Sequence, residues 1–515
     1  MKSPPNILLI LSDQQRCDTL GVLNPKIKTP NLDRIAREGM LFERAYAPTP
    51  VCLPCRASVI TGQYPSRHGA THNETQLLQT HSPLISTTLR KRGYYTHMAG
   101  KSHLSSCHDP MGAESAPHIH NRGYFRNWHG PWYGFEYADI SIGHSTEAHA
   151  CGMHYGVWLE DRGIDPEKYF ARTAYDDFGA WDLPEEHHNS TWVADVTIEA
   201  MTRAAGRGQP FFIWANFADP HNPCMVPEPW AGMYDPESIP TFGFKPGEPA
   251  SFASKPPFYM EILERSGPYA ARPADPGLPG AGNVSHLGYT QAQTQRNAAA
   301  YYGMVSLMDK HIGRILDALD KSGEADNTLV VFASDHGDLL GDHGMWWKSL
   351  VCFDESMRVP MLARFPDRIP AGSRCRGFQS LIDLFPTFCD FTGVRTPRSC
   401  EGVSQREVWL GAKLAARADV IVEERPYSTD FTQRFIVTDT HKLGFYADRP
   451  YGELYDIVND PDHIHNLWDD PRHREIKEKL IARILSHEIN KGLPTPGPSE
   501  TAREREPAFE SVPKI

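Results

Sequence analysis

The runs Asn6-Ile-Leu-Leu-Ile-Leu-Ser-Asp13 and Thr328-Leu-Val-Val-Phe-Ala-Ser-Asp-His336 share one pattern, because each is apolar throughout and then reaches Ser and Asp. A continuous apolar run of this length is typical of a parallel strand that is buried on both faces. Ligands of open α/β sheets gather outside the carboxyl ends of the strands. We therefore expect Asp13 and Asp335 to meet at one edge of a sheet, despite their separation in the sequence.

Helical patterns alternate with these apolar runs. The segment Pro210–Phe217 is a third such run, and Ala218-Asp-Pro-His221 then places a histidine at the same edge. Thr29–Gly39 has the Thr, Pro and Gly that start and stop a helix, and Gln293–Ser322 is amphipathic over a longer stretch. Alternating strands and helices predict a doubly wound α/β sheet.

The remaining segments predict two insertions, a small C-terminal subdomain and a tail. Segments 105–190 and 223–290 are rich in Gly, Pro, Trp, Tyr and His without clear periodicity. Such insertions typically form the rim of a binding site and select the substrate. Beyond residue 400, Arg434–Thr438 and Lys442–Tyr446 flank a polar turn and predict an antiparallel sheet. We expect an α/β domain over 1–400, an α+β subdomain over 401–492, and a tail rich in Pro and charge over 493–515.

The composition is that of an ordinary globular protein. Hydrophobic residues make up 40% and charged residues 23% of the 515 residues, which excludes a disordered chain. The net charge of -12 argues against nucleic acid as a partner, because phosphate contacts need concentrated Lys and Arg. The apolar run Ile7–Leu11 is too short for a signal core, and no stretch approaches the ~20 apolar residues of a membrane span. We therefore expect a cytoplasmic protein that does not engage a membrane.

Ten cysteines are scattered through the chain without the density of a disulfide scaffold, so we expect reduced thiols. Cys52 and Cys55 form a C-x-x-C pair, but no second pair with the spacing of a zinc site follows. Pro54 predicts a helix that opens directly after Cys52, where unpaired N–H donors and the helix dipole favour an oxyanion. Arg56 could hold a tetrahedral anion, or it could form a structural ion pair.

The segment Cys52-Leu-Pro-Cys-Arg-Ala-Ser-Val-Ile-Thr-Gly62 resembles the sulfatase signature C-x-P-x-R followed by T-G. The resemblance implies an alkaline-phosphatase-like fold, with a mixed, mostly parallel sheet flanked by helices and a smaller C-terminal subdomain with an antiparallel sheet. In that family a formylglycine-generating enzyme oxidises the cysteine, and the hydrated aldehyde attacks sulfur. Only Cys52 has Pro at +2 and Arg at +4, so Cys55 is interpreted as a packed small hydrophobe.

A second stretch, Gly93–His103, resembles the other signature of the family through its G-K-x-H core. The resemblance implies that Lys101 holds the nucleophile and a sulfate oxygen, while His103 takes a proton as the sulfated hydrate collapses and releases sulfate. By the same resemblance, His221 and Lys348 contact sulfate and the leaving oxygen. Asn73 is a further candidate for a sulfate contact.

The resemblance also implies a metal site. Asp335 and His336 match the metal segment at a strand end of the family and, together with Asp13, Gln14 and the modified Cys52, would form a site of oxygen ligands with one imidazole. Calcium, magnesium and manganese all suit such a site. The commonest sulfatase pattern has Asp-Asp at the first strand and Asp-Asn at the later one, and an imidazole in place of Asn shifts the preference toward manganese. Asp-Gln with Asp-His also resembles the phosphonate monoester hydrolases, a sister group with the same formylglycine.

Each of these residues has an ordinary alternative when taken singly. An Asp or Gln after a strand usually caps a turn, a Lys is usually a solvated charge, and a His is usually buried and hydrogen-bonded. The seven histidines of the first insertion are interpreted as scattered rim residues rather than a second metal cluster: His108, His118, His120, His129, His144, His149 and His154.

The combination of motifs predicts an arylsulfatase-like enzyme, which we expect to form a homo-oligomer and to hydrolyse small sulfate esters. Lys101 and His103 favour this hypothesis over the first alternative, a phosphonate monoester or phosphodiester hydrolase of the same superfamily. The second alternative is a catalytically silent protein that binds a sulfated ligand.

Overall fold

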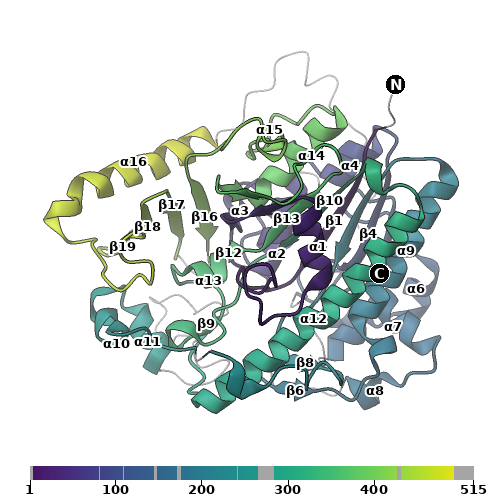
Figure 1. Ribbon diagram of the computed structural model, residues 1–515, viewed down its shortest axis with the longest axis horizontal. Helices are drawn as coiled ribbons and strands as arrows, with labels where there is room; N and C mark the ends of the chain where they lie inside the picture. Colours follow the sequence, from purple (N-terminus) through teal and green to yellow (C-terminus); the bar gives the residue numbers. More distant parts are fainter. Residues whose placement is uncertain are drawn as a thin grey trace.

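The computed structural model describes residues 4–79, 82–107, 109–143, 146, 148–170, 176–240, 242–264, 284–425 and 431–491. Among these residues, eight strands form a central sheet in the order β14-β2-β13-β10-β1-β7-β4-β5 (Figure 1). The strands are β14 (Ser373–Cys375), β2 (Met40–Phe42), β13 (Met361–Arg364), β10 (Thr328–Ser334), β1 (Asn6–Ser12), β7 (Phe211–Asn216), β4 (Tyr95–Lys101) and β5 (Tyr137–Ser141). The five strands from β10 to β5 are parallel, whereas β13 is antiparallel to both of its neighbours. The predicted mixed, mostly parallel sheet is confirmed.

The register of the two central strands sets the position of the residues that follow them. β1 and β10 pair in parallel from Asn6 opposite Thr328 to Ser12 opposite Ser334. Both strands are buried along their whole length, as their continuous apolar runs predicted. Asp13 and Asp335 are the next residues in this register, so they emerge side by side at the carboxyl edge.

Helices cover both faces of the sheet. On one face, Leu8 and Ile10 of β1 pack with α1 (Pro30–Glu38), α9 (Asn189–Arg207) and α12 (Gln291–Lys321), and α12 crosses the front of the view in Figure 1. On the other face, Ile7 and Leu9 of the same strand pack with α2 (Cys52–Thr61), α4 (Ile85–Arg90) and α14 (Leu384–Thr392). Successive side chains of a strand point to opposite faces, so β1 contributes to both layers.

Two helices were predicted closely. α1 runs from Pro30 to Glu38, as the Thr, Pro and Gly of that segment indicated. α12 begins at Gln291, slightly earlier than predicted, because the side chains and backbone N–H groups of Thr290 and Gln293 form a reciprocal capping box.

The first predicted insertion contributes a strand to the central sheet. β5 pairs in parallel with β4, with Tyr137 opposite His97. The sequence did not indicate this strand, because Asp139 interrupts a short apolar run. Inside the structure, Asp139 is compensated by two histidines, with its Oδ1 2.7 Å from His129 Nδ1 and its Oδ2 3.3 Å from His97 Nε2.

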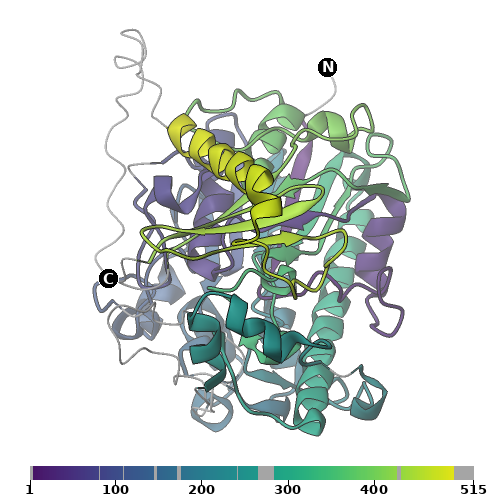
Figure 2. The ribbon, with the colours of Figure 1, turned by 90° about the vertical axis from the view of Figure 1, so that its left-hand side faces the viewer.

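The C-terminal residues form a separate antiparallel sheet, as predicted. Its order is β16 (Val420–Glu424), β17 (Gln433–Val437), β18 (His441–Tyr446) and β19 (Gly452–Asp456). The predicted hairpin corresponds to β17 and β18. Helix α16 (Arg474–Asn490) lies across one face of this sheet and packs Leu480 and Ile484 against it (Figure 2).

Short elements connect these layers. The small sheets are β12 (Arg358–Val359) with β3 (Ala45–Tyr46) and β15 (Gln379–Ser380), β11 (Trp346–Trp347) with β9 (Val284–Ser285), and β6 (Phe178–Ala180) with β8 (Cys224–Val226). The short helices include α3 (Pro65–His68), α5 (Ala116–Ile119), α6 (Arg122–Asn127), α7 (Met153–Glu160), α8 (Pro166–Tyr169), α10 (Glu248–Ser251), α11 (Phe258–Glu264), α13 (Asp354–Met357) and α15 (Arg406–Trp409).

In the part of the chain that the structure describes, no helix combines the length and the apolar character needed to cross a membrane. All ten cysteines are free thiols.

Candidate active site

Four parallel strands end side by side at the site. The segments that leave β10, β1 and β7 carry Asp335, Asp13 and His221, and β4 ends in Lys101. The backbone N–H of Asp13 donates to Asp219 O at 3.1 Å, which ties the end of β1 to the segment after β7. The carboxyl edge of the sheet therefore gathers the residues that the motifs singled out.

Helix α2 presents Cys52 to this edge. Cys52 is the first residue of the helix, after an extended Val51, and its sulfur is buried. Cys52 Sγ lies 3.1 Å from His336 Nε2 and 3.7 Å from Asp13 Oδ1. The predicted start of the helix is confirmed, so the positive end of its dipole lies beside Asp13 and His336. Cys55, one turn on, packs in the hydrophobic core, as expected.

Asn73 fixes the first turn of this helix. Its Oδ1 accepts a hydrogen bond of 3.1 Å from the backbone N–H of Leu53. Asn73 is nearly buried and comes from the segment after α3. The amide predicted to contact sulfate therefore lies beside Cys52 and caps one of the orphan donors of α2.

Four donor groups converge tightly enough to hold one metal ion. Ligand atoms of Asp13, Cys52, Asp335 and His336 all lie within 4.8 Å of one another, and all four residues are buried. His336 Nδ1 donates to Gly337 O at 2.9 Å, so the lone pair of its Nε2 faces the group. Burial lowers the pKa of His336 to about 4, which keeps this imidazole neutral.

The electrostatics of the two carboxylates also fit a cation. Burial and the neighbouring Asp13 raise the pKa of Asp335 to about 6. Burial opposes ionisation of Asp13 as well, but Lys101 and the neighbouring cations hold the pKa of Asp13 well below its usual value. Two buried carboxylates beside a neutral imidazole are the ligands that hard divalent ions accept, with the imidazole favouring manganese.

Gln14 lies beside this group, but its side chain contacts other residues. Its Nε2 donates to Asn222 Oδ1 at 2.9 Å and to Asp338 Oδ2 at 2.5 Å, and its Oε1 accepts from Lys348. The backbone N–H of Gln14 donates to Asp335 Oδ1 at 3.1 Å. Four of the five predicted metal ligands thus meet, while the Gln14 amide links the Lys348 ammonium to Asn222 and Asp338.

The Arg56 guanidinium bridges the carboxylates of Asp13 and Asp335. Its Nε donates to Asp335 Oδ2 at 2.9 Å and its Nη2 to Asp13 Oδ2 at 3.1 Å, and all three side chains are fully buried. Its Nη1 donates to Asn216 Oδ1 and to the backbone oxygen of Lys101, each at 3.0 Å. These contacts correspond to the ion-pair alternative for Arg56, in which the guanidinium positions the two carboxylates.

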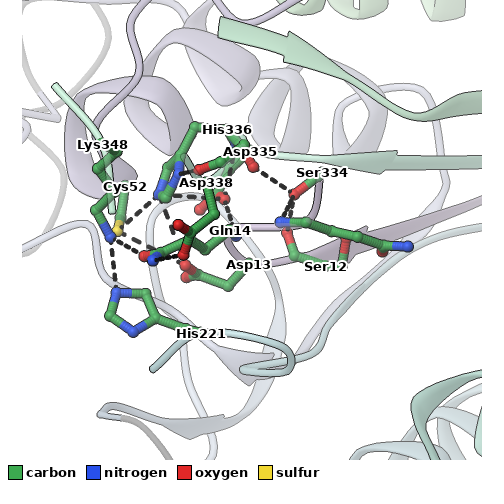
Figure 3. Close-up of polar contacts among 12 residues, drawn as sticks. Ser12, Asp13, Gln14, Cys52, His221, Ser334, Asp335, His336, Asp338 and Lys348 are labelled. Atoms are coloured by element: carbon green, nitrogen blue, oxygen red, sulfur yellow. Dashed lines mark hydrogen bonds and ion pairs between the residues drawn. The ribbon is translucent and has the colours of Figure 1, made fainter. Parts of the chain in front are cut away.

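Three basic side chains complete the site. Lys101 Nζ lies 2.6 Å from Asp13 Oδ2. Lys348 Nζ lies 2.7 Å from His221 Nε2, while His221 Nδ1 donates to Asn222 O at 2.6 Å. His221 Nε2 therefore accepts from the Lys348 ammonium. Figure 3 shows Lys348, His221 and His336 directed toward Cys52.

His103 is held by a residue that the motifs did not reveal. His103 has a left-handed backbone, with φ of 49°, and is buried directly after β4. The Glu114 carboxylate accepts from the backbone N–H groups of His103, Leu104 and Ser105 at 2.8, 2.8 and 2.6 Å. Glu114 lies in an aperiodic insertion, so no sequence signal marks it.

Asn216 and Asp338 were also missed, although both have a position that could have revealed them. Asn216 lies in the predicted third apolar run and is the last residue of β7, at the edge where ligands gather. Asp338 lies between the predicted site residues His336 and Lys348 and accepts from the backbone N–H groups of Leu340 and Trp347 at 2.7 and 3.1 Å.

Two histidines of the first insertion lie together, contrary to the prediction that all seven are scattered. His129 and His154 lie with Asp139 within the distance of a metal site, and the centroids of their rings are 4.8 Å apart. The backbone uses both ring nitrogens of His154, because Nδ1 accepts from Ile140 N at 3.0 Å and Nε2 donates to Trp128 O at 2.7 Å. We interpret this group as support for the edge of β5. Three of the seven histidines have no described side chain: His108, His144 and His149. The predicted tail over 493–515 also lies outside the described residues.

Family models match almost the whole described chain. A model of the sulfatase family matches residues 5–394. A second model, described as N-sulphoglucosamine sulphohydrolase, C-terminal, matches residues 341–490. The two matches overlap over the segment that carries Lys348.

Curated relatives and solved structures agree with these matches. An arylsulfatase of Clostridium perfringens is 29% identical over 503 residues, which cover 94% of each chain. The multifunctional alkaline phosphatase superfamily protein PehA of Trinickia caryophylli is also 29% identical, over 94% of this chain and 95% of its own length. The phosphonate monoester hydrolase SpPMH of Silicibacter pomeroyi superposes with a TM-score of 0.77 at 25% identity, covering 95% of this chain and 96% of its own.

Removal of the Arg56 guanidinium tests the electrostatic role assigned to it. We expect Arg56→Met to lower the free energy of unfolding by about 3–5 kcal/mol in EDTA, because the buried Asp335 carboxylate loses its guanidinium partner and Asp13 keeps only Lys101. Urea unfolding in EDTA measures this loss. Excess manganese should recover part of it by binding the folded state.

The matched control is Arg34→Met, which removes a partly exposed guanidinium paired with Glu38 and Asp320. Its expected cost is within about 1 kcal/mol. Equal losses in the two variants would contradict the role of Arg56 as the counter-charge of the strand-end carboxylates.

Proposed function

Because this chain belongs to the sulfatase family, we propose that it hydrolyses a small sulfate ester with a formylglycine made from Cys52 and a divalent metal ion bound beside it. The observation that carries the proposal is the convergence of Cys52 with Asp13, Asp335 and His336 in one buried group. A structural thiol would not require two carboxylates, a neutral imidazole and several cations around it.

Asp13, Asp335, His336 and residue 52 would hold the metal ion. A bound divalent ion supplies Lewis-acid polarisation of a sulfuryl oxygen and favours ionisation of a nearby hydroxyl. Manganese and calcium fit this donor set, and magnesium is a further possibility. Gln14 stays a predicted ligand, although its Oε1 accepts a hydrogen bond from Lys348 in this structure.

Cys52 Sγ stands where the oxygen of the oxidised residue would lie. Formylglycine, made by a formylglycine-generating enzyme, supplies a hydrated aldehyde with one hydroxyl for attack and a second from which the product can be released. The position at the start of α2 favours negative charge on that oxygen. Lys101 orients Asp13 through a 2.6 Å ion pair and adds positive charge for a sulfate oxygen.

Lys348 and His221 would assist the leaving group. The Lys348 ammonium already donates to His221 Nε2, so an ester oxygen arriving between the two could take over that hydrogen bond. Negative charge that develops on the leaving oxygen would then be stabilised by a donor fixed in advance. His103, held by Glu114 at the end of β4, would accept a proton during the release of sulfate. Asn73 would orient the anion beside the first turn of α2.

Hydrolysis of a phosphonate monoester is the second candidate function. The sequence pairs Asp13 with Gln14 and Asp335 with His336, and two phosphonate monoester hydrolases superpose on this chain with TM-scores of 0.77 and 0.76. Lys101 and His103 favour sulfate esters, because they form the Lys-x-His pair of the second sulfatase signature that Gly93–His103 resembles.

Substrate preference separates the two candidates. We expect kcat/KM for 4-nitrophenyl sulfate to exceed that for phenyl 4-nitrophenyl phosphonate, measured at matched metal content and matched conversion of Cys52. The opposite order would favour the phosphonate hydrolase. Saturable binding of sulfate esters without turnover, together with unmodified Cys52, would indicate the silent binding protein.

The position of the nucleophile gives a second prediction. Cys52→Ala should abolish turnover and leave the melting temperature nearly unchanged, whereas Cys55→Ala should retain activity because Cys55 only packs in the core. Mass spectrometry of the peptide that contains Cys52 should find a mass about 18 Da below that of the thiol form. Equal loss of activity in both variants would contradict the assignment of position 52.

A further inference from the structure

The backbone around Lys348 adopts a rare conformation. Trp347, Ser349 and Leu350 have φ values of 70°, 83° and 67°, so Lys348 lies within a run of left-handed residues that are not glycine. Such a conformation costs about 1–3 kcal/mol per residue and persists only where surrounding contacts enforce it. The contacts that enforce it therefore fix the position of Lys348.

On the N-terminal side, the enforcing contacts come from the sheet edge. The backbone N–H of Trp347 donates to Asp338 Oδ1 at 3.1 Å, and Trp347 O accepts from Leu339 N at 2.7 Å. Asp338 also binds the amide of Gln14. Trp347 is thus linked through Asp338 to the Gln14 amide, which contacts the Lys348 ammonium.

On the C-terminal side, the enforcing contacts come from the small antiparallel sheet. Glu424, the last residue of β16, accepts from the Ser349 hydroxyl and from the backbone N–H of Leu350, the latter at 2.7 Å. Gln433, its partner on β17, donates to the same carboxylate at 2.5 Å. Glu424 is only 1% exposed, and burial raises its pKa to about 7. Burying a carboxyl group costs free energy unless it is hydrogen-bonded, and these three fixed donors compensate that cost.

We propose that Glu424 is a positioning residue that holds the Ser349–Leu350 backbone and thereby directs the Lys348 ammonium toward His221 and Gln14. The inference rests on the proposed function, in which Lys348 assists the leaving group. It makes the C-terminal sheet a required part of the active site, because a carboxylate of β16 fixes a basic side chain of the main sheet edge. Lys348 itself makes the chemical contact, and Glu424 acts through it.

The neighbouring residue on β16 offers a matched control. Glu423 is also 1% exposed, but alternation along the strand directs it to the opposite face. Its carboxylate accepts from the backbone N–H and hydroxyl of Ser66 at 2.9 and 3.2 Å and pairs with Lys491. Glu423→Ala therefore removes a buried carboxylate of the same size from the same strand without touching the Lys348 segment.

Steady-state kinetics with a sulfate ester test the inference. We expect Glu424→Ala to lower kcat about 100-fold with a small change in KM, because a displaced ammonium no longer meets the leaving oxygen. Glu424→Asp keeps a buried carboxyl but shortens it by one methylene, so it should fold and lose about tenfold in kcat. Glu423→Ala should stay within a few-fold of the unaltered protein. Equal losses in Glu423→Ala and Glu424→Ala would overturn the proposal.

A double variant identifies the residue through which Glu424 acts. Combining Glu424→Ala with Lys348→Ala should give the same kcat as Lys348→Ala alone, since the two changes disable one group. Multiplicative losses would show that Glu424 acts independently of Lys348 and would refute the positioning role.

Hydrogen exchange provides a readout that does not depend on turnover. Glu424→Ala and Glu424→Asp should speed exchange of the Leu350 amide, and Glu423→Ala should not. If the unaltered protein hydrolyses no sulfate ester, the proposed function fails, while exchange still decides whether Glu424 holds this segment. If the protein is active and exchange at Leu350 is the same in all variants, the inference fails and the proposed function stands.

Discussion

The central constraint is the burial of two carboxylates at the ends of neighbouring strands. The parallel register of β1 and β10 makes Asp13 and Asp335 adjacent, and neither side chain is exposed to water. Like charges in such a position are stable only beside fixed positive charge. Arg56 bridges both carboxylates and Lys101 pairs with Asp13, so α2 and β4 must approach this edge. The same approach brings Cys52 into contact with His336.

Features governed by local sequence patterns could be predicted. The apolar runs before Asp13 and Asp335 gave the central strands, because a strand covered on both faces needs apolar side chains at every position. Pro54 and the signature around Cys52 located the start of α2, and polar residues between two short runs located the hairpin of β17 and β18. The residues that follow these strands could then be assigned to one edge without knowledge of the helices between them.

Features governed by contacts between distant segments could not be predicted. Glu114 and Glu424 accept hydrogen bonds from backbone N–H groups at the site, but both lie in segments without any motif. From the sequence alone, a carboxylate in such a segment is expected to be a surface charge. The Gln14 amide can donate as well as accept, so its hydrogen bonds depend on Asn222 and Asp338, which only the fold brings near. β5 could not be predicted, because the charge of Asp139 within the strand is balanced only by His97 and His129, which lie elsewhere in the sequence.

The proposed chemistry requires a cation between the strand-end carboxylates and position 52. Anomalous diffraction at the manganese edge, from crystals grown with manganese, tests this most directly. We predict one strong peak in contact with Asp13, Asp335, His336 and residue 52. The absence of a peak among these side chains, or a peak only at another place in the molecule, would contradict the account.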